Sequence, residues 1–147
     1  MALAIRPATA CDAAVAASLV TQLGYPTSPE QAGERLARLA AEASTTVLLA
    51  VEGESVVGLA VLRVEGLIEH DRPAGVLLAL VVDEARRGRG VGRALVRAVE
   101  ERAREVGCFA VVLNTADHRA GAHAFYQRLG YRDTGRRFAR ALLAEAG

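Results

Sequence analysis

The 147-residue sequence contains no lysine, and all 18 of its basic residues are arginine. This absence excludes a lysine nucleophile, a Schiff-base lysine and the lysine of a phosphate-binding P-loop. Cysteine is scarce as well, since only Cys11 and Cys108 occur and they form no C-x-x-C pair. Two cysteines are too few for a disulfide scaffold. No metal site is predicted, and Cys108, beside an apolar run, is expected to be a small core residue.

Long apolar runs are also missing, and none approaches the roughly 18 residues that span a bilayer. The N-terminus lacks the charged start, apolar block and cleavage site of a signal peptide. We therefore expect a cytoplasmic location. The formal net charge is only +1, and no basic cluster is interleaved with stacking aromatics. Neither a nucleic acid nor a membrane surface is expected as a partner.

What is present suits one domain over residues 1–147, because 52% of the residues are hydrophobic and 24% are charged. Apolar periodicity and turn residues divide the chain into alternating elements. Strands are predicted at Ala2–Arg6, Thr46–Val51, Val56–Val64, Val76–Val82, Phe109–Leu113 and Tyr131–Leu143. Helices are predicted from Asp12 to Leu23, and over Pro29–Ala43, Val91–Val106 and Ala120–Leu129.

Local signals support these boundaries. Asp12 can cap the first helix, and Ser28 with Gln31 forms a capping box for the second. Gly53 lies between two β-branched runs and predicts a hairpin. The strands Val76–Val82 and Phe109–Leu113 are almost wholly apolar, which is typical of buried strands, and the helix between them implies a parallel pair.

The segment Arg87-Gly88-Arg89-Gly90-Val91-Gly92-Arg93 carries the strongest chemical signal. It joins a buried strand to an amphipathic helix, whose N-terminus presents unpaired N–H groups and a partial positive charge. Glycines let that backbone approach an anion closely, and the four arginines from Arg86 to Arg93 add positive charge, which predicts a pyrophosphate site. The alternative is an ordinary exposed turn with a basic rim. A dinucleotide fingerprint does not fit, because the glycines stand as G-x-G-x-G in mid-chain.

The spacing Arg87-x-x-Gly90-x-Gly92 resembles the pyrophosphate loop of the GNAT superfamily of acetyl-CoA-dependent N-acetyltransferases. The resemblance extends to the opening Ile5-Arg6-Pro7-Ala8-Thr9, the turn Leu23-Gly24-Tyr25-Pro26 and the ending Phe125-Tyr126 with Gly130-Tyr131. It implies an α/β fold with a mixed, mostly antiparallel central sheet, a splayed parallel strand pair and flanking helices.

In proteins that the chain resembles, the pantetheine arm of acetyl-CoA lies in the splay and pairs with the backbone of the first strand. The resemblance assigns this pairing to Leu80, Val81 and Val82, and it assigns the pyrophosphate to the loop Arg87–Arg93. It further implies cofactor contacts at Asn114, Arg119, Ala122 and Tyr126. Asn114 could instead be a turn residue, and Arg119 stands where family members have a second asparagine. His123 is as readily a solvated or capping residue as a cofactor contact.

Tyr126 occupies the family's general-acid position, where a phenol can protonate the departing thiolate. Its alternative role is a packed aromatic on the last helix. The resemblance defines the position of the general base less well than that of the acid. Glu69 is the candidate, with His70, Asp71 and Glu65 nearby. A polar surface loop explains these charges equally. An acidic cluster there would suit a cationic amine.

The resemblance implies an enzyme that transfers acetyl directly from acetyl-CoA to a primary amine of a small molecule or peptide. No G-x-S-x-G elbow and no cysteine motif offers a covalent route. A catalytically silent acyl-CoA-binding module or sensor is the alternative. Family habit and the apolar tail Phe138–Leu143 indicate a possible homodimer. The helices around Gly24–Pro29 and the loop Gly66–Gly75 are expected to form the pocket for the acceptor.

Overall fold

The computed structural model describes residues 2–115 and 120–143. The chain forms two compact units, residues 1–113 and 114–147. The first unit contains all the strands of the described chain, and the second contains one helix. Each unit is described by itself below.

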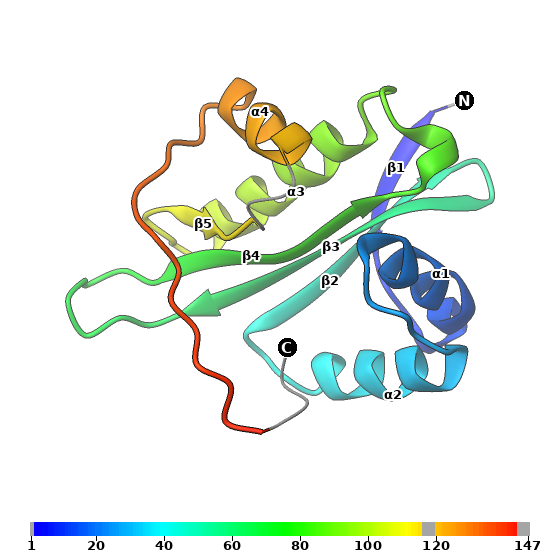
Figure 1. Ribbon diagram of the computed structural model, residues 1–147, viewed down its shortest axis with the longest axis horizontal. Helices are drawn as coiled ribbons and strands as arrows, with labels where there is room; N and C mark the ends of the chain where they lie inside the picture. Colours follow the sequence, from blue (N-terminus) through cyan, green and yellow to red (C-terminus); the bar gives the residue numbers. More distant parts are fainter. Residues whose placement is uncertain (1, 116–119, 144–147) are drawn as a thin grey trace. The chain divides into compact units, whose positions relative to one another are not determined.

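The first unit is a five-stranded sheet with helices on both faces (Figure 1). Its strands are ordered β1-β2-β3-β4-β5, and every neighbouring pair is antiparallel except β4 and β5, which are parallel. The elements are β1 (Leu3–Pro7), η1 (Ala10–Asp12), α1 (Ala13–Leu23), α2 (Pro29–Ala40), β2 (Thr45–Glu52), β3 (Ser55–Glu65), β4 (Ala74–Val82), η2 (Glu84–Arg86), α3 (Val91–Glu105) and β5 (Val111–Leu113). The mixed, mostly antiparallel sheet with one parallel pair confirms the expected fold class.

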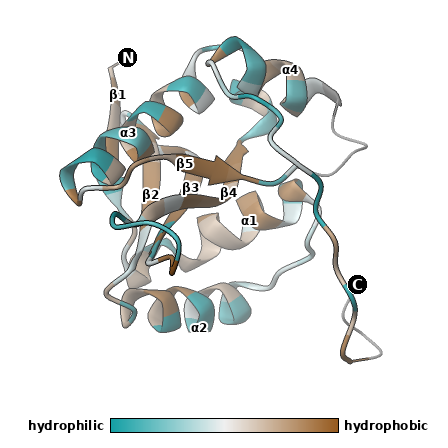
Figure 2. Ribbon diagram, turned by 90° about the vertical axis from the view of Figure 1, so that its left-hand side faces the viewer, coloured by the Kyte–Doolittle hydropathy of each residue, from teal (hydrophilic) through white to brown (hydrophobic). Residues whose placement is uncertain are grey.

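The helices α1 and α2 cover one face of the sheet and α3 covers the other, so the apolar strands lie between two helical layers (Figures 1 and 2). Between the first layer and the sheet, small and branched residues from both form one buried cluster: Ala16, Ala17, Leu19, Ala32, Leu49, Leu59, Val61 and Val81. On the other face α3 buries Val91, Leu95, Val96, Val99 and Ala103. The core is thus shared between both faces of one sheet.

Glycine permits the close approach of α3 to the sheet. A Cβ added at Gly58 would lie 2.9 Å from Leu95 Cδ1 and 3.1 Å from Val91 Cγ1. A Cβ at Gly75 would lie 3.3 Å from the Cβ of Ala103. The lack of a Cβ at Gly58 therefore allows the first turns of α3 to pack closely on the sheet, and the lack of one at Gly75 allows the same for its last turns.

A β-bulge interrupts β4. The register with β3 passes from Val61↔Ala79 to Leu62↔Leu77, so Leu78 has no direct partner. Because successive side chains alternate between faces, the extra residue changes which positions face each helical layer. Before the bulge Gly75 faces α3, and after it Ala79 and Val81 pack with α1 and α2.

Some expectations for the strands are wrong. Leu78 is 43% exposed, so β4 is not buried along its whole length on both faces. The strand β5 spans only three residues, and Phe109 and Val112 are each 46% exposed. A strand at the edge of a sheet is covered less completely than a central one, and apolar composition alone does not distinguish the two.

Two helix ends also differ from expectation. The Ser28–Gln31 capping box is confirmed, with Gln31 N–H donating to Ser28 Oγ over 3.1 Å and Ser28 N–H donating to Gln31 Oε1 over 2.9 Å. However, α2 ends at Ala40 rather than at Ala43. The helix α3 ends at Glu105 rather than at Val106, and Val106 is 39% exposed. Asp12 precedes α1 as predicted, but its carboxylate makes no cap hydrogen bond to that helix.

The second unit contains α4 (Ala120–Arg128), and Gly130, two residues beyond its end, has a positive φ of 95°. Three aromatic side chains gather around it: the ring centroid of Tyr126 lies 5.1 Å from that of Phe125 and 5.8 Å from that of Tyr131. The strand predicted at Tyr131–Leu143 is absent, because these residues enter no strand ladder. Clustered arginines break the apolar alternation there, and Phe138, Leu142 and Leu143 are exposed.

Asp12 is a buried carboxylate that joins β1 to the start of α1. Arg6 donates two 2.9 Å hydrogen bonds to its two oxygens, and the backbone N–H of Thr9 donates another of 2.7 Å. The bonds from Arg6, together with that from Thr9, lower the pKa of Asp12 from 3.8 to about 2. A depressed pKa means that the carboxylate stabilises the fold above about pH 4, and that this stabilisation is lost as the pH falls toward 2.

We expect Asp12→Asn to lower the free energy of unfolding at pH 7 by roughly 1.5–3 kcal/mol, the usual worth of hydrogen bonds to a charged group. The variant should also lose the part of the acid dependence that falls between about pH 4 and 2. Urea titrations at pH 7 and pH 3 measure both effects. Asp133→Asn, at an exposed carboxylate in the second unit, is the matched control. Equal stability of Asp12→Asn and the unmodified protein at pH 7 would contradict the expectation.

Candidate active site

The second half of β4 has an open edge. The parallel pairing with β5 covers only Gly75↔Val111, Val76↔Val112 and Leu77↔Leu113. Beyond Leu77, residues Ala79–Val82 pair with β3 on one side and, within the described residues, with no strand on the other. The bulge at Leu78 coincides with the end of the parallel pairing. Backbone donors and acceptors along this edge are thus available to an extended ligand.

The residues predicted to hold the pantetheine arm, Leu80, Val81 and Val82, lie on this open half. Val81 is 5% exposed and packs in the core, while Leu80 and Val82 are half-buried. Their side chains thus serve packing, and only their backbone can serve a ligand at the edge.

The glycine loop after β4 leads into α3 as predicted. Gly88 and Gly90 have φ values of +81° and +84°, a conformation that favours glycine, and Gly90 is the N-cap of α3. Among the described residues no side chain caps this helix, and its first turn contains no acidic residue. Its first N–H groups therefore have no capping side chain as competitor for an anion.

Gly92 is a glycine that the backbone does not require. It lies in the first turn of α3 and is not among the glycines with positive φ. Alanine has a helix propensity about 1 kcal/mol more favourable there, so conformation alone does not account for glycine. A close approach of a ligand to the helix start does account for it.

The arginines of the loop divide into two groups. Arg86 turns away, with its Nη1 3.7 Å from Glu52 Oε1 on β2, so it is not available to an anion as we had assumed. Arg87, Arg89 and Arg93 are exposed, and Arg87 Nε donates to the carbonyl of Val82 over 3.2 Å. The side chain of Val91 is buried against the position of Gly58, so Val91 can contribute only its backbone N–H.

The candidate base loop lies at the other end of β4. Glu69, His70 and Asp71 are exposed and precede Ala74, whereas the glycine loop follows Val82. Nine strand residues separate the two loops, which is about 30 Å. His70 stacks on Phe109 with ring centroids 4.2 Å apart.

Glu65, the other carboxylate considered as a base, lies at the end of β3. Its Oε1 accepts from Arg63 Nη2 over 2.6 Å, so its charge is already paired.

The remaining predicted site residues belong to the second unit. Asn114 is exposed and follows β5 directly, while Arg119 lies outside the described residues. Ala122, His123 and Tyr126 are half-buried on α4. Tyr126 contacts Phe125 and Tyr131, so a packing role is present in the structure alongside the chemical role that the resemblance implies.

Sequence reasoning missed two features of the site. The bulge at Leu78 leaves no trace in a uniformly apolar strand, because such a strand has no alternation for the bulge to shift. The contact of Gln22 with Asp83 and Glu84 joins residues about 60 positions apart, and no local pattern marks it.

Cys108 is half-buried, and burial raises the pKa of its thiol, which makes it a poor nucleophile.

Two searches of the described residues complete the inventory of the site. Within residues 2–115 and 120–143, no group of three His, Cys, Asp or Glu side chains is arranged to hold a metal ion. None of the helices in that part of the chain is long and apolar enough to cross a membrane.

A strand with an open edge, a glycine loop and a helix N-terminus without a side-chain cap together have the chemistry to hold an extended ligand that carries a pyrophosphate. Residues 14–131 match the Acetyltransferase (GNAT) family. The chain belongs to this family, which confirms the resemblance inferred from the loop.

Curated relatives of the chain are N-acetyltransferases. It is 34% identical over 141 residues to the aminoglycoside N(6')-acetyltransferase type 1 of Stenotrophomonas maltophilia, a match covering 90% of the chain and 88% of that protein. It is 36% identical over 94 residues to the aminoalkylphosphonate N-acetyltransferase of Salmonella typhimurium, covering 64% and 61%. The match to rat N-acetyltransferase 8F1 covers 41% of that protein, so the chain spans less than two thirds of several relatives.

Solved structures share the fold. A putative acetyltransferase from Agrobacterium tumefaciens superposes with a TM-score of 0.83 at 31% identity, covering 93% of this chain and 99% of that one. An aminoglycoside N-acetyltransferase AAC(6')-Iy in complex with CoA has a TM-score of 0.84 at 20% identity, covering 97% and 96%. At 20% identity, the similarity to the aminoglycoside N-acetyltransferase AAC(6')-Iy shows only that the two chains share a fold.

Gly92→Ala tests the anion site without straining the backbone. We expect the variant to fold with equal or slightly higher stability, by up to about 1 kcal/mol. Its affinity for acetyl-CoA should fall by about 10- to 100-fold, equivalent to losing one hydrogen bond to a charged group. Isothermal calorimetry measures the affinity.

Gly33→Ala is the matched control for this experiment, because Gly33 is a helical glycine in α2 whose added Cβ would meet only Ala13 Cβ, at 3.6 Å. Its affinity for acetyl-CoA should stay unchanged. An undiminished affinity of Gly92→Ala for acetyl-CoA would show that Gly92 is not part of the binding site.

Proposed function

We propose that this protein is an N-acetyltransferase that moves an acetyl group from acetyl-CoA directly to a primary amine of a small molecule or peptide. The observation that carries the proposal is the glycine loop at the start of α3, placed at the end of the open half of β4. Membership of the GNAT family supports it, as do relatives that are themselves N-acetyltransferases.

The residues of the first unit fit the cofactor in two places. A pyrophosphate would accept hydrogen bonds from the N–H groups at the start of α3, with Arg87, Arg89 and Arg93 supplying charge around it. An extended arm would pair with the open backbone edge at Leu80–Val82, as an added strand does. Acetyl-CoA supplies the acetyl group as a thioester, and the chain has to hold that thioester beside the acceptor amine.

In the second unit, we propose that Asn114, Arg119, Ala122 and Tyr126 contact the cofactor. The support for these four positions is the family resemblance of the segment that follows β5. Tyr126 would also act as the general acid that protonates the departing thiolate, which removes the cost of expelling it as an anion. Its half-buried place among Phe125 and Tyr131 would hold the ring in one orientation.

Tyr126→Phe keeps the ring and its contacts but deletes the acidic proton. We expect the protein to release CoA thiol from acetyl-CoA when a primary amine is supplied, and Tyr126→Phe to do so roughly 100- to 10,000-fold more slowly. Acetyl-CoA affinity and melting temperature should change little. Single-turnover measurement is needed, since product release can mask a chemical step.

Two outcomes would count against this assignment. An unchanged single-turnover rate in Tyr126→Phe would show that another group protonates the thiolate. The absence of thiol release from the unmodified protein across a panel of amines would instead favour a silent acyl-CoA-binding module.

For the general base we propose Glu69. It lies in a loop that also carries Asp71 and His70, and all three are exposed to solvent, where an amine can reach them. A carboxylate in this loop would accept the proton of an incoming ammonium group, directly or through water.

Glu69→Ala should therefore need a higher pH to reach the turnover of the unmodified protein, because the free amine must then form unaided. The measurement is the pH dependence of kcat/KM with the amine acceptor that is used best. Asp71→Ala, two residues away in the same loop, is the matched control and separates loss of the base from loss of local charge. A pH profile of Glu69→Ala that overlays the original would exclude Glu69 as the base.

The acceptor we propose is a cationic amine. The relatives named for aminoglycoside and aminoalkylphosphonate acetylation act on amine-bearing small molecules. The acidic residues of the base loop, Glu69 and Asp71, would attract a positive charge.

A homodimer and a cytoplasmic location complete the proposal. Phe138, Leu142 and Leu143 are 75–90% exposed, which suits an apolar tail that packs on a second copy. Light scattering that shows a monomer at micromolar concentration would exclude the dimer. Both cysteines are free, in keeping with a reducing compartment.

A further inference from the structure

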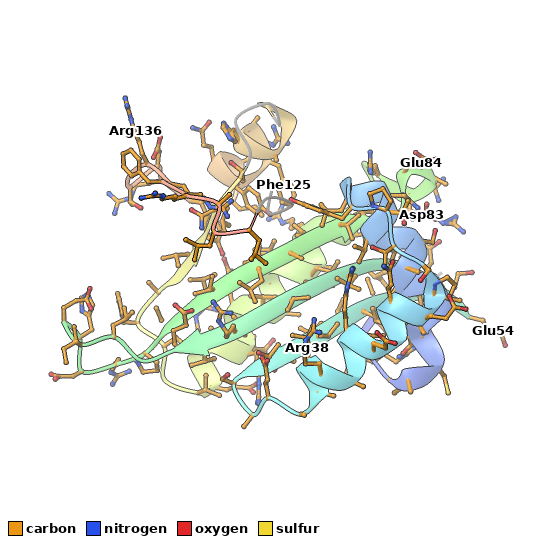
Figure 3. All side chains as sticks on the ribbon, turned by 60° about the horizontal axis from the view of Figure 1, so that its bottom comes forward. Arg38, Glu54, Asp83, Glu84, Phe125 and Arg136 are labelled. Carbon is orange, nitrogen blue, oxygen red and sulfur yellow. The ribbon has the colours of Figure 1, made fainter. Side chains whose placement is uncertain are left out.

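The side chain of Gln22 connects the end of α1 to the start of the loop that leads to the glycine site. Its Oε1 accepts a 2.9 Å hydrogen bond from the backbone N–H of Glu84, and its Nε2 donates to Asp83 Oδ1 over 3.3 Å. Figure 3 shows Asp83 beside the end of α1, with Glu84 next to it at the start of η2. Gln22 is half-buried, and its bond to Asp83 is partly buried, whereas its bond from Glu84 is exposed.

The loop residues that Gln22 holds are themselves fixed to the sheet. Asp83 N–H donates to the carbonyl of Val57 over 2.8 Å, and Arg86 N–H donates to the carbonyl of Asp83 over 2.8 Å. The N–H of Glu84 opens η2, a position with no acceptor within the helix, so Gln22 satisfies an otherwise unpaired donor. The loop start therefore has one preferred position relative to α1, and the loop continues from there to Gly88 and Gly90.

On its other side Gln22 adjoins the turn between α1 and α2. Thr21 Oγ1 accepts from the N–H of Thr27 over 3.1 Å and donates to the carbonyl of the same residue over 3.3 Å. Tyr25, within this closed turn, is 62% exposed. Gly24 N–H donates to the carbonyl of Thr21, so the turn is attached directly to the last turn of α1. This turn is the one expected on the acceptor side.

We propose that Gln22 is a positioning residue that couples the glycine loop to the turn at residues 24–27. A ligand that draws the loop into its bound position would, through the two hydrogen bonds of Gln22, also fix the end of α1 and the turn attached to it. Thermodynamic linkage makes the coupling reciprocal, so fixing the turn at residues 24–27 also favours the bound position of the glycine loop. The inference rests on the proposed function, because acetyl-CoA is the ligand of the loop.

Three variants separate coupling from simple stability. Gln22→Met keeps the length of the side chain and removes both hydrogen bonds. Gln31→Met makes the same change in the α2 capping box, where it removes the 2.9 Å hydrogen bond from Ser28 N–H to Gln31 Oε1, and it serves as the matched control. The double variant Gln22→Glu with Asp83→Asn restores both hydrogen bonds, with donor and acceptor exchanged between residues 22 and 83.

Amide hydrogen exchange with and without saturating acetyl-CoA is the decisive measurement. In the unmodified protein acetyl-CoA should slow exchange in both residues 86–92 and residues 21–27. In Gln22→Met the slowing should persist at 86–92 and disappear at 21–27, while the affinity falls about tenfold. Gln31→Met should retain the acetyl-CoA affinity and both protected segments, and the double variant should recover them.

Continued protection of residues 21–27 in Gln22→Met would overturn the inference, as would failure of the double variant to recover it. An unmodified protein that binds acetyl-CoA and shows protection only at 86–92 would also overturn it, and would leave the proposed function intact. A protein that does not bind acetyl-CoA at all would refute the proposed function and the inference together.

Discussion

The close packing of α3 on the sheet at Gly58 determines where the anion site can be. The position of Gly58 lies within van der Waals contact of Val91 and Leu95, both of which are fully buried, so the first turns of the helix have little freedom to shift. The N-terminus of α3 is thereby held at the end of β4, and the glycine loop has to span the interval between them. A helix seated less closely would present the same N–H groups in a less defined direction. The chemistry proposed for the loop thus depends on a contact in the core.

A second constraint acts through β4. The bulge at Leu78 and the end of the parallel pairing at Leu77 fall at the same place, so the strand is paired on both sides before that point and on one side after it. The bulge also moves Ala79 and Val81 onto the face covered by α1 and α2. One strand therefore supplies core packing for both helical layers and an open edge for a ligand. The loop that follows it is attached through Gln22 to the end of α1, and the turn at residues 24–27 follows α1 directly.

Much of this arrangement could be predicted from the sequence, and the exceptions have physical reasons. The hairpin around Gly53, the capping box at Ser28 and the strand–glycine loop–helix passage depend on local chemistry, and the structure confirms them. The prediction of a last strand is wrong because an apolar tail does not specify a partner strand, and four arginines between Tyr131 and Leu143 interrupt it. The role of Asp12 was misjudged because its partner Arg6 lies on another element. Arg86 looked like a ligand for the anion because its pairing with Glu52 depends on the sheet.

The central claim is that acetyl-CoA lies along one continuous path, from the N-terminus of α3 to the open edge of β4. Nuclear magnetic resonance of the 15N-labelled protein during titration with acetyl-CoA tests it most directly. The account predicts large amide shifts at Gly88–Arg93 and at Leu78–Val82, with much smaller shifts along β1 and β2, which lie on the far side of β3. Saturable binding that shifts β1 and β2 while leaving the glycine loop and the second half of β4 unchanged would contradict it.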